Sequence, residues 1–334
     1  MSQLTDTVRA LMQQGKGILA ADESSNTCNK RFETVGIEQT EENRRRYREL
    51  LFTTPGIEEY LSGIILFDET MRQISSGGKT FPELLVEKNI LVGIKVDQGL
   101  EDVEGGQLTK GIETLAERIQ EYVHLHAAFT KWRAVAKVGD GYGDQVIKEN
   151  AKRIAAYACL AQKAGLVPIV EPEVLMEGAH SAEGAEGAII ETVAIVFDAL
   201  KSAGASVPHL ILKTSMAVSG KEATERALPE EVGERTARAL KTAVPDDAGG
   251  VVFLSGGQSP EEACANLNAI ARIEPLPWPI TFSFARALQS EALAEWKGKD
   301  ENLDEAQAMF LKRVALVAAA QSGGYSPGME SSAL

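Results

Sequence analysis

Charged side chains recur at the ends of short apolar runs along this sequence. Such side chains are costly inside a folded chain unless they are paired or used, and several of them converging favour an active site. The set holds carboxylates, which can move protons, and amines, which can attack a carbonyl carbon. Its members are Asp22 and Glu23, Lys95 and Asp97, Lys131 and Arg133, Glu171 and Glu173, Lys213, and Arg286.

Lys213 stands within the apolar run Leu210–Thr214. A lysine in such a place is either the partner in a buried ion pair or an activated amine. The nearby cations Lys131 and Lys95 favour the second interpretation, because burial and like charge both lower the pKa of a lysine and free its neutral form. Lys213 is therefore predicted to act as a nucleophile.

A pair of glycines follows a later apolar run, in the segment Ser255-Gly256-Gly257-Gln258. Glycine lets backbone N–H groups approach an anion closely. Arg286, after the next run, can supply a forked charge to the same anion. A lone Ser-Gly-Gly is more often a turn, but beside Arg286 it predicts a phosphate site.

The histidines do not predict a metal centre. His124 and His126 stand two apart on an expected helix and so face different directions, and the other two histidines are isolated. The carboxylates of Glu171 and Glu173 have no histidine near them in the sequence, which argues against metal catalysis. We therefore expect no metal and no other cofactor.

The remaining arginines and the tryptophans have plainer interpretations. The run Arg44–Arg46 lies in a helical pattern and is expected to form a solvated helix face. An alternative places Arg31 or this run beside a second substrate phosphate. Trp132, Trp278 and Trp296 are interpreted as packing residues.

Short apolar runs that read as strands alternate with longer segments of helical periodicity. The segment 144–164 repeats apolar residues at helical spacing and stops at Gly165. Ser259 and Glu262 predict a capping box at the start of another helix, and 228–243 begins in a similar way. The strand-like runs are 17–21, 62–67, 91–96, 131–137, 167–171, 209–214, 250–254 and 280–284.

Strands that alternate with helices imply a parallel sheet, and eight strands can close it into a (β/α)8 TIM barrel. The alternative is an open doubly wound sheet, but that fold usually opens with a Gly-x-Gly-x-x-Gly turn, which the sequence lacks. We expect a single α/β domain over 1–334, with an extra N-terminal helix and a short, mobile C-terminal tail at about 325–334. Barrel active sites lie at the C-terminal ends of the strands, where the charged residues gather.

Composition narrows the function classes. The chain has 334 residues, 44% of them hydrophobic, and a formal net charge of -14, which argues against nucleic-acid binding. It has no apolar run long enough to span a membrane, and its first residues lack the layout of a signal peptide. Three widely spaced cysteines fit a reducing cytoplasm better than a disulfide framework.

Several ordered motifs together resemble class I fructose-bisphosphate aldolases over about residues 5 to 325. Each motif alone is weak, whereas the ordered set is specific. The motifs are Gly15-Lys16-Gly17-Ile18-Leu19-Ala20-Ala21-Asp22-Glu23-Ser24, Thr40-Glu41-Glu42-Asn43-Arg44-Arg45, Val92-Gly93-Ile94-Lys95-Val96-Asp97, Lys131-Trp132-Arg133, Val167-Pro168-Ile169-Val170-Glu171-Pro172-Glu173, Leu254-Ser255-Gly256-Gly257-Gln258-Ser259 and Arg286-Ala287-Leu288-Gln289.

The resemblance implies a role for each catalytic candidate. Lys213 matches the lysine that forms the Schiff base, and Glu171 resembles the acid/base that makes and dehydrates the carbinolamine. Asp22 resembles the group that handles the C4 hydroxyl proton. Lys131 matches the cation that positions and polarises the substrate, with Glu173 and Lys95 in hydrogen-bonding support.

The resemblance also implies the substrate contacts and the cellular setting. Ser255, Gly256 and Arg286 resemble the site for the ketone-side phosphate, and Lys95, Arg133, Arg31 and Ser24 resemble substrate contacts elsewhere in the site. A cytoplasmic homotetramer that cleaves fructose 1,6-bisphosphate in glycolysis and gluconeogenesis is the expectation. Alternatives are activity on sedoheptulose 1,7-bisphosphate and a non-catalytic scaffold.

The sequence departs from the family pattern at three places. It reads Lys213-Thr214-Ser215-Met216 where many relatives have Lys-Pro-Asn-Met, and Ala285 stands where glycine is common. Its last tyrosine is Tyr325, not the terminal residue. A catalytic role for Tyr325 is an alternative to the expected one, in which it packs against the barrel.

Overall fold

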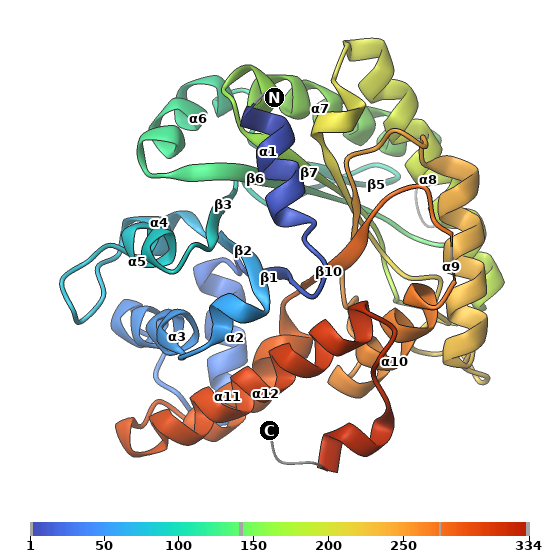
Figure 1. The fold of residues 1–334 in the computed structure, drawn as a ribbon. Helices are drawn as coiled ribbons and strands as arrows, with labels where there is room; N and C mark the ends of the chain where they lie inside the picture. The colour runs from blue at the N-terminus through green and yellow to red at the C-terminus, as the bar shows by residue number, and fades with distance from the viewer. Residues whose placement is uncertain (1–2, 140–142, 274, 332–334) are drawn as a thin grey trace.

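The computed structural model describes residues 3–139, 143–273 and 275–331, and it confirms the TIM barrel (Figure 1). The parallel strands close in the order β1-β10-β9-β8-β7-β6-β3-β2. The barrel strands are β1 (Gly17–Ala21), β2 (Leu61–Leu66), β3 (Leu91–Lys95), β6 (Ala127–Ala136), β7 (Val167–Val174), β8 (Ile211–Thr214), β9 (Val251–Phe253) and β10 (Ile280–Phe284).

Helices surround this barrel, and two of the predicted helix ends are confirmed. The Ser259–Glu262 capping box is present, and Gly165 takes a positive φ of 80° just past the end of α7. The α-helices are α1 (Gln3–Leu11), α2 (Ser25–Val35), α3 (Glu41–Thr53), α4 (Asp68–Arg72), α5 (Phe81–Glu87), α6 (Leu115–His124), α7 (Asp144–Lys163), α8 (Ala182–Ala203), α9 (Pro229–Ala243), α10 (Pro260–Ala271), α11 (Arg286–Trp296) and α12 (Leu303–Gln321). The 3-10 helices are η1 (Ile57–Glu59), η2 (Val207–His209), η3 (Asp300–Asn302) and η4 (Pro327–Ser331).

The barrel interior is closed at one end by the predicted N-terminal helix. Leu11 on α1 packs against the apolar residues inside the barrel, and Figure 1 shows α1 lying across that end. The ring of Phe129 fills the base, where a methyl group on Gly93 would lie only 2.3 Å from it. The three tryptophans are buried in the layer between strands and helices, as predicted. The charged residues of the strands therefore gather at the opposite end of the barrel, where the strands end.

Two local features differ from the expectation. An antiparallel hairpin of β4 (Leu100–Val103) and β5 (Gly106–Thr109) follows β3, where the sequence analysis named no strands. The helix α6 ends at His124, and His126 lies beyond it with a φ of 67°. Both residues were expected on one helix, so that prediction was wrong by two residues.

The C-terminal tail is held against the barrel, at least as far as Ser331, and the expectation of a mobile tail was wrong for this part. Pro327–Ser331 forms η4, and Glu330 makes two 2.8 Å hydrogen bonds with the buried guanidinium of Arg313. Tyr325 is buried and donates its hydroxyl hydrogen to Glu330 over 2.9 Å. Tyr325 therefore packs on the outer layer of helices. Residues 332–334 of the predicted tail lie outside the described residues.

Candidate active site

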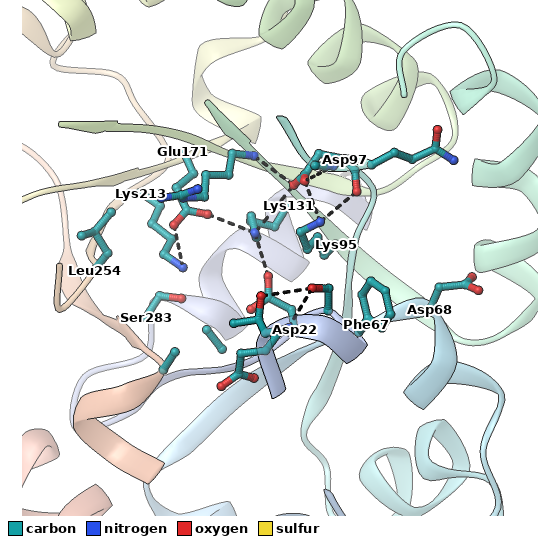
Figure 2. A pocket seen from close by; sticks show the side chains of 18 of the residues that line it. Asp22, Phe67, Asp68, Lys95, Asp97, Lys131, Glu171, Lys213, Leu254 and Ser283 are labelled. Carbon is teal, nitrogen blue, oxygen red and sulfur yellow. Dashed lines mark hydrogen bonds and ion pairs between the residues drawn. The ribbon is translucent and has the colours of Figure 1, made fainter. Parts of the chain in front are cut away.

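A cavity of about 860 Å³ opens at the C-terminal ends of the barrel strands, a size typical of small-molecule sites. The sequence-predicted site residues form its wall, with the exception of Arg31. Figure 2 shows the side chains that point into it. The predicted residues that line the cavity are Asp22, Ser24, Lys95, Lys131, Arg133, Glu171, Glu173, Lys213, Ser255, Gly256 and Arg286.

Strand register brings the reactive side chains together. Lys95 on β3 pairs directly with Lys131 on β6, and Arg133 pairs with Glu171 on β7. The pairing of β7 with β8 then sets Lys213 beside Glu171, because their preceding residues are partners. Residues that are far apart in the chain therefore meet within one side-chain length.

Lys213 is buried in the cavity wall, only 4% exposed, and its Nζ lies 3.1 Å from Glu171 Oε1. The other carboxylate oxygen of Glu171 makes no hydrogen bond within the described residues and lies 3.3 Å from Lys131 Nζ. Glu171 thus contacts the predicted nucleophile on one side and still has an oxygen that can exchange a proton with a bound ligand.

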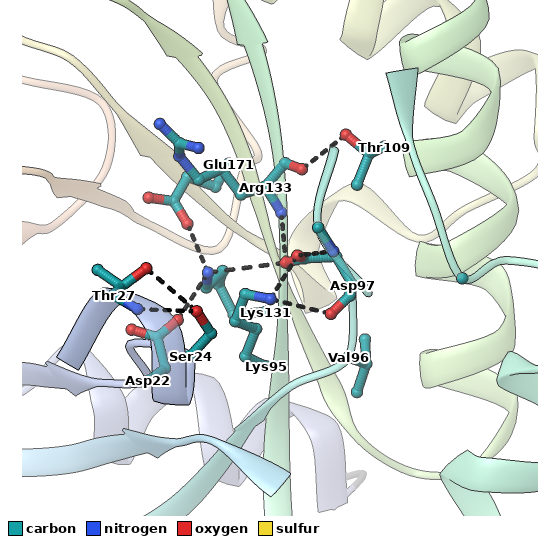
Figure 3. A network of polar contacts seen from close by, with 12 residues as sticks. Asp22, Ser24, Thr27, Lys95, Val96, Asp97, Thr109, Lys131, Arg133 and Glu171 are labelled. Atoms are coloured by element: carbon teal, nitrogen blue, oxygen red, sulfur yellow. Dashed lines mark hydrogen bonds and ion pairs between the residues drawn. The ribbon is translucent and has the colours of Figure 1, made fainter. Parts of the chain in front are cut away.

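Lys131 is the hub of the network (Figures 2 and 3). Its buried Nζ lies 2.7 Å from Asp22 Oδ2, 3.3 Å from Glu171 Oε2 and 3.8 Å from Asp97 Oδ2. One ammonium group therefore holds carboxylates that come from three different parts of the barrel. Without it, these buried negative charges would repel one another.

The network fixes the charge of its members. Burial alone would raise the pKa of Asp22, but the ammonium groups of Lys131, Lys213 and Lys95 outweigh it and lower that pKa to about 2. Burial disfavours a charged lysine, but Asp22, Glu171 and Asp97 raise the pKa of Lys131 well above its ordinary value. Near neutral pH, Asp22 is a carboxylate and Lys131 is a cation.

A second layer of pairs holds Lys95 and Arg133 (Figure 3). Lys95 Nζ lies 2.6 Å from Asp97 Oδ1, and the backbone N–H of Arg133 donates to Asp97 Oδ2 over 3.2 Å. The guanidinium of Arg133 pairs with Glu173. Glu173 therefore contacts Arg133, whereas the support it was expected to give to Lys131 comes from Asp97.

The glycine loop has the backbone geometry of an anion site. Gly256 and Gly257 have successive positive φ angles of 55° and 90°, a conformation that suits glycine, and glycine lets the backbone come close to an anion. Ala285 keeps a negative φ of -107°, so alanine fits the position where glycine is common. The side chain of Arg286 is exposed next to this loop.

Arg31 is not among the described residues that line the cavity, and its role as a substrate contact stays a prediction. Its guanidinium pairs with Glu23, donates to Gln289 Oε1 over 2.8 Å and donates to the Tyr47 hydroxyl over 3.3 Å. Tyr47 lies on α3 and Gln289 on α11, so these contacts join α2 to two other helices. Through its pair with Glu23, the residue after Asp22, Arg31 stabilises the end of β1 from the helical layer.

The run Arg44–Arg46 is not a freely solvated face. Arg44 and Arg45 are only 12% and 18% exposed, and both pair with glutamates, Arg44 with Glu69. Arg46 pairs with Asp300. None of the three lines the cavity described above, so they serve the packing of α3.

Comparison with known proteins settles the family. The class I fructose-bisphosphate aldolase family model matches residues 3–334. The chain belongs to the class I fructose-bisphosphate aldolase family. It is 46% identical over 332 residues to fructose-bisphosphate aldolase 5, cytosolic, of Arabidopsis thaliana, spanning 98% of this chain and 92% of that protein. It is 45% identical over 318 residues to the probable fructose-bisphosphate aldolase class 1 of Xylella fastidiosa, spanning 94% and 95%.

The fold comparison agrees. A solved structure of fructose-bisphosphate aldolase from Plasmodium falciparum, in complex with TRAP and an inhibitor, superposes with a TM-score of 0.95 at 43% identity. The match covers 98% of this chain and 96% of that one. This aldolase is therefore a lyase, and its class works through a Schiff-base lysine without a metal.

Two cavity residues of this aldolase were missed in the choice of site residues. Asp97 was noted beside Lys95 but given no role, although it contacts both Lys95 and Lys131. Ser283 is buried on β10 and lines the cavity, and its Oγ has no hydrogen-bond partner within the described residues. The available signal for it was a hydroxyl near the end of the strand-like run Ile280–Phe284, where Thr281 is the other hydroxyl.

Within the described ranges, no group of histidine, cysteine and carboxylate side chains is arranged to hold a metal ion. No helix in the same ranges has the length and apolar character that crossing a membrane requires. Cys28, Cys159 and Cys264 are free thiols.

Proposed function

We propose that Lys213 is the amine through which this aldolase reversibly cleaves fructose 1,6-bisphosphate to dihydroxyacetone phosphate and glyceraldehyde 3-phosphate. The observation that carries the proposal is the buried contact of Lys213 with Glu171, 3.1 Å apart, at the wall of a cavity that offers cations and N–H groups. An amine in contact with a carboxylate has the partner it needs to lose and regain protons.

The reaction begins at the ketone carbon C2. The Lys213 nitrogen attacks C2, and Glu171 carries protons while the carbinolamine forms and loses water. The product is an iminium, which is an electron sink for the next step. Glu171 suits this work because one of its oxygens makes no hydrogen bond within the described part of the chain.

Cleavage breaks the bond between C3 and C4. A base removes the proton of the C4 hydroxyl, C4 becomes the aldehyde carbon of glyceraldehyde 3-phosphate, and the bonding electrons pass to the iminium as an enamine. Asp22 is the proposed base, since it is a carboxylate in the network. A substrate oxygen that takes over the 2.7 Å contact with Lys131 would restore basicity to Asp22 at the moment it is needed.

Release completes the cycle. The enamine takes a proton at C3, water adds to C2 of the resulting iminium, and dihydroxyacetone phosphate leaves with the Lys213 amine regenerated. No atom or electron pair beyond water and the transferred protons is required.

Two groups of cavity residues are proposed to hold the substrate phosphates. Ser255, Gly256 and Arg286 take the ketone-side phosphate, supported by the positive φ of the glycine and the exposed guanidinium. The other phosphate is assigned to the end that carries Lys95, Arg133 and Ser24. Support comes from the position of Ser24, which caps the N-terminus of α2, a helix end that attracts anions.

The test is product analysis with competing sugars. Purified protein is supplied with fructose 1,6-bisphosphate or sedoheptulose 1,7-bisphosphate, and triose phosphate release is followed. Cleavage of the fructose substrate at the higher kcat/KM supports the proposal. A clear preference for sedoheptulose 1,7-bisphosphate would make that sugar the substrate in place of fructose 1,6-bisphosphate. No cleavage of either sugar would indicate a non-catalytic scaffold.

We also propose that the enzyme works in the cytosol as a homotetramer. The cytosolic names of two Arabidopsis relatives, 46% and 45% identical, support the location. Family resemblance supports the assembly. Light scattering of the purified protein tests it, since a mass near that of one 35.9 kDa chain would refute the tetramer.

A further inference from the structure

A lysine that the mechanism has not used approaches the glycine loop from the segment after β8. Lys221 is exposed, and its Nζ lies 3.3 Å from the point where a methyl group on Gly257 would stand. The Nη2 of Arg286 lies 3.7 Å from the same point. Two cations from different barrel loops therefore flank one glycine, with their nitrogens no more than about 7 Å apart.

Neither Lys221 nor Arg286 forms an ion pair with a carboxylate among the described residues. The chain as a whole is acidic, with a formal net charge of -14. Most arginines described above are paired with carboxylates. Two unpaired like charges held near each other repel, and a bound anion turns that repulsion into attraction.

The backbone places Lys221 here by fixed contacts. Its N–H donates to the carbonyl of Met176 over 2.9 Å, and the N–H of Gly220 donates to the carbonyl of His180 over 2.8 Å. A methyl group on Gly220 would lie only 2.1 Å from the carbonyl oxygen of Gly178, so this position requires glycine. The loops after β7 and β8 are thereby joined, and Lys221 is held toward the glycine loop.

We propose that Lys221 is a second cation of the ketone-side phosphate site and binds the same phosphate as Arg286 and the Gly256–Gly257 backbone. The inference rests on the proposed function, because it takes the ligand to be a sugar phosphate. Arg286 offers a flat fork of donors, whereas Lys221 offers a compact charge on a flexible stem. The pair neutralises a phosphate dianion that one arginine alone would leave half compensated.

The experiment compares Lys221→Met with the matched control Lys201→Met. Lys201 is an exposed lysine in the last turn of α8, near the end of the barrel where the strands begin. Each protein is assayed with fructose 1,6-bisphosphate and with fructose 1-phosphate, which keeps the ketone-side phosphate and lacks the other. Trapping of dihydroxyacetone phosphate on Lys213 by borohydride is measured in parallel.

For Lys221→Met, KM is expected to rise about tenfold for both substrates, by the same factor, while kcat changes less than KM. The control is expected to match the wild type. An unchanged KM for both sugars would overturn the inference, and so would a rise confined to fructose 1,6-bisphosphate, because that would place Lys221 at the other phosphate. Failure of the proposed function looks different, since the wild type itself would then neither cleave the sugar nor be trapped at Lys213.

Discussion

Replacing Lys131 by methionine removes the one cation that contacts Asp22, Glu171 and Asp97 together. The Lys131 side chain is 3% exposed, so water cannot take the place of its ammonium group without structural change. Breaking a buried ion pair by removing one partner costs about 3–5 kcal/mol. For Asp22 alone, the difference between the ordinary pKa of 3.8 and about 2 corresponds to about 2 kcal/mol.

The sign of the pH dependence follows from the direction of the shift. The lowered pKa of Asp22 stabilises the wild type above pH 3.8, and this contribution is lost as the pH falls through about 2. In the variant Asp22 loses its nearest cation and stays buried, so its pKa rises, and its charge destabilises the fold at neutral pH but not once it is protonated. The deficit of the variant should therefore be largest near pH 7 and shrink as the pH falls below about 5.

Urea denaturation at pH 7 and at acid pH measures both effects. We expect the free energy of unfolding of Lys131→Met to fall by about 3 kcal/mol at pH 7, and cleavage activity to be lost. Lys152→Met is the matched control. The Lys152 side chain is 74% exposed and its Nζ approaches the partner Glu149 no closer than 3.9 Å, so the loss of this pair should cost about 0.5 kcal/mol or less. A deficit below about 1 kcal/mol at pH 7, or one that grows in acid, would refute the reasoning.

Three further outcomes are expected. Arg286→Ala should weaken substrate binding by about 1.5–3 kcal/mol, seen as a higher KM with a smaller change in kcat, and an unchanged KM would place the phosphate elsewhere. EDTA should leave cleavage unchanged because the iminium is the electron sink, and activity lost to EDTA and restored by zinc would contradict this. Deletion of 327–334 should keep cleavage within about threefold. It should lower the thermal unfolding temperature, because Arg313 loses its hydrogen bonds to Glu330. A hundredfold loss of activity would show that the tail serves the active site.

Much of the fold and of the site was predictable because both depend on local periodicity. Strands show as short apolar runs, and residues two apart on a strand share a face, so Lys131 lies on the same face as Arg133 and Glu171 on the same face as Glu173. Parallel strands then bring their C-terminal ends to one mouth. The cavity wall confirms that these side chains are gathered there.

What could not be predicted depends on partners far away in the chain. Nothing near Arg31 in the sequence shows that Gln289, 258 positions later, accepts its hydrogen bond. Lys221 lies in an irregular segment without periodicity, so its approach to Gly257 appears only in three dimensions. The tail shows the same effect, because Glu330 pairs with the guanidinium of Arg313 on α12, 17 positions earlier.

The hairpin of β4 and β5 was missed for a different reason. Its strands are four residues each, β4 carries two acidic side chains and β5 is mostly polar, so they lack the apolar pattern by which the other strands were found. The turn signal was present, since Gly105 has a φ of 82° between them. A search for glycine turns as well as apolar runs would have found this element.

The central claim is that Lys213 forms the Schiff base, and borohydride trapping tests it most directly. The protein is mixed with dihydroxyacetone phosphate, reduced, digested and mapped by mass spectrometry, with Lys213→Met as the control. We expect a single reduced adduct on Lys213, dependent on the ligand and absent from the variant. An adduct on Lys95 or Lys131, or no adduct from an enzyme that still cleaves its substrate, would contradict the claim.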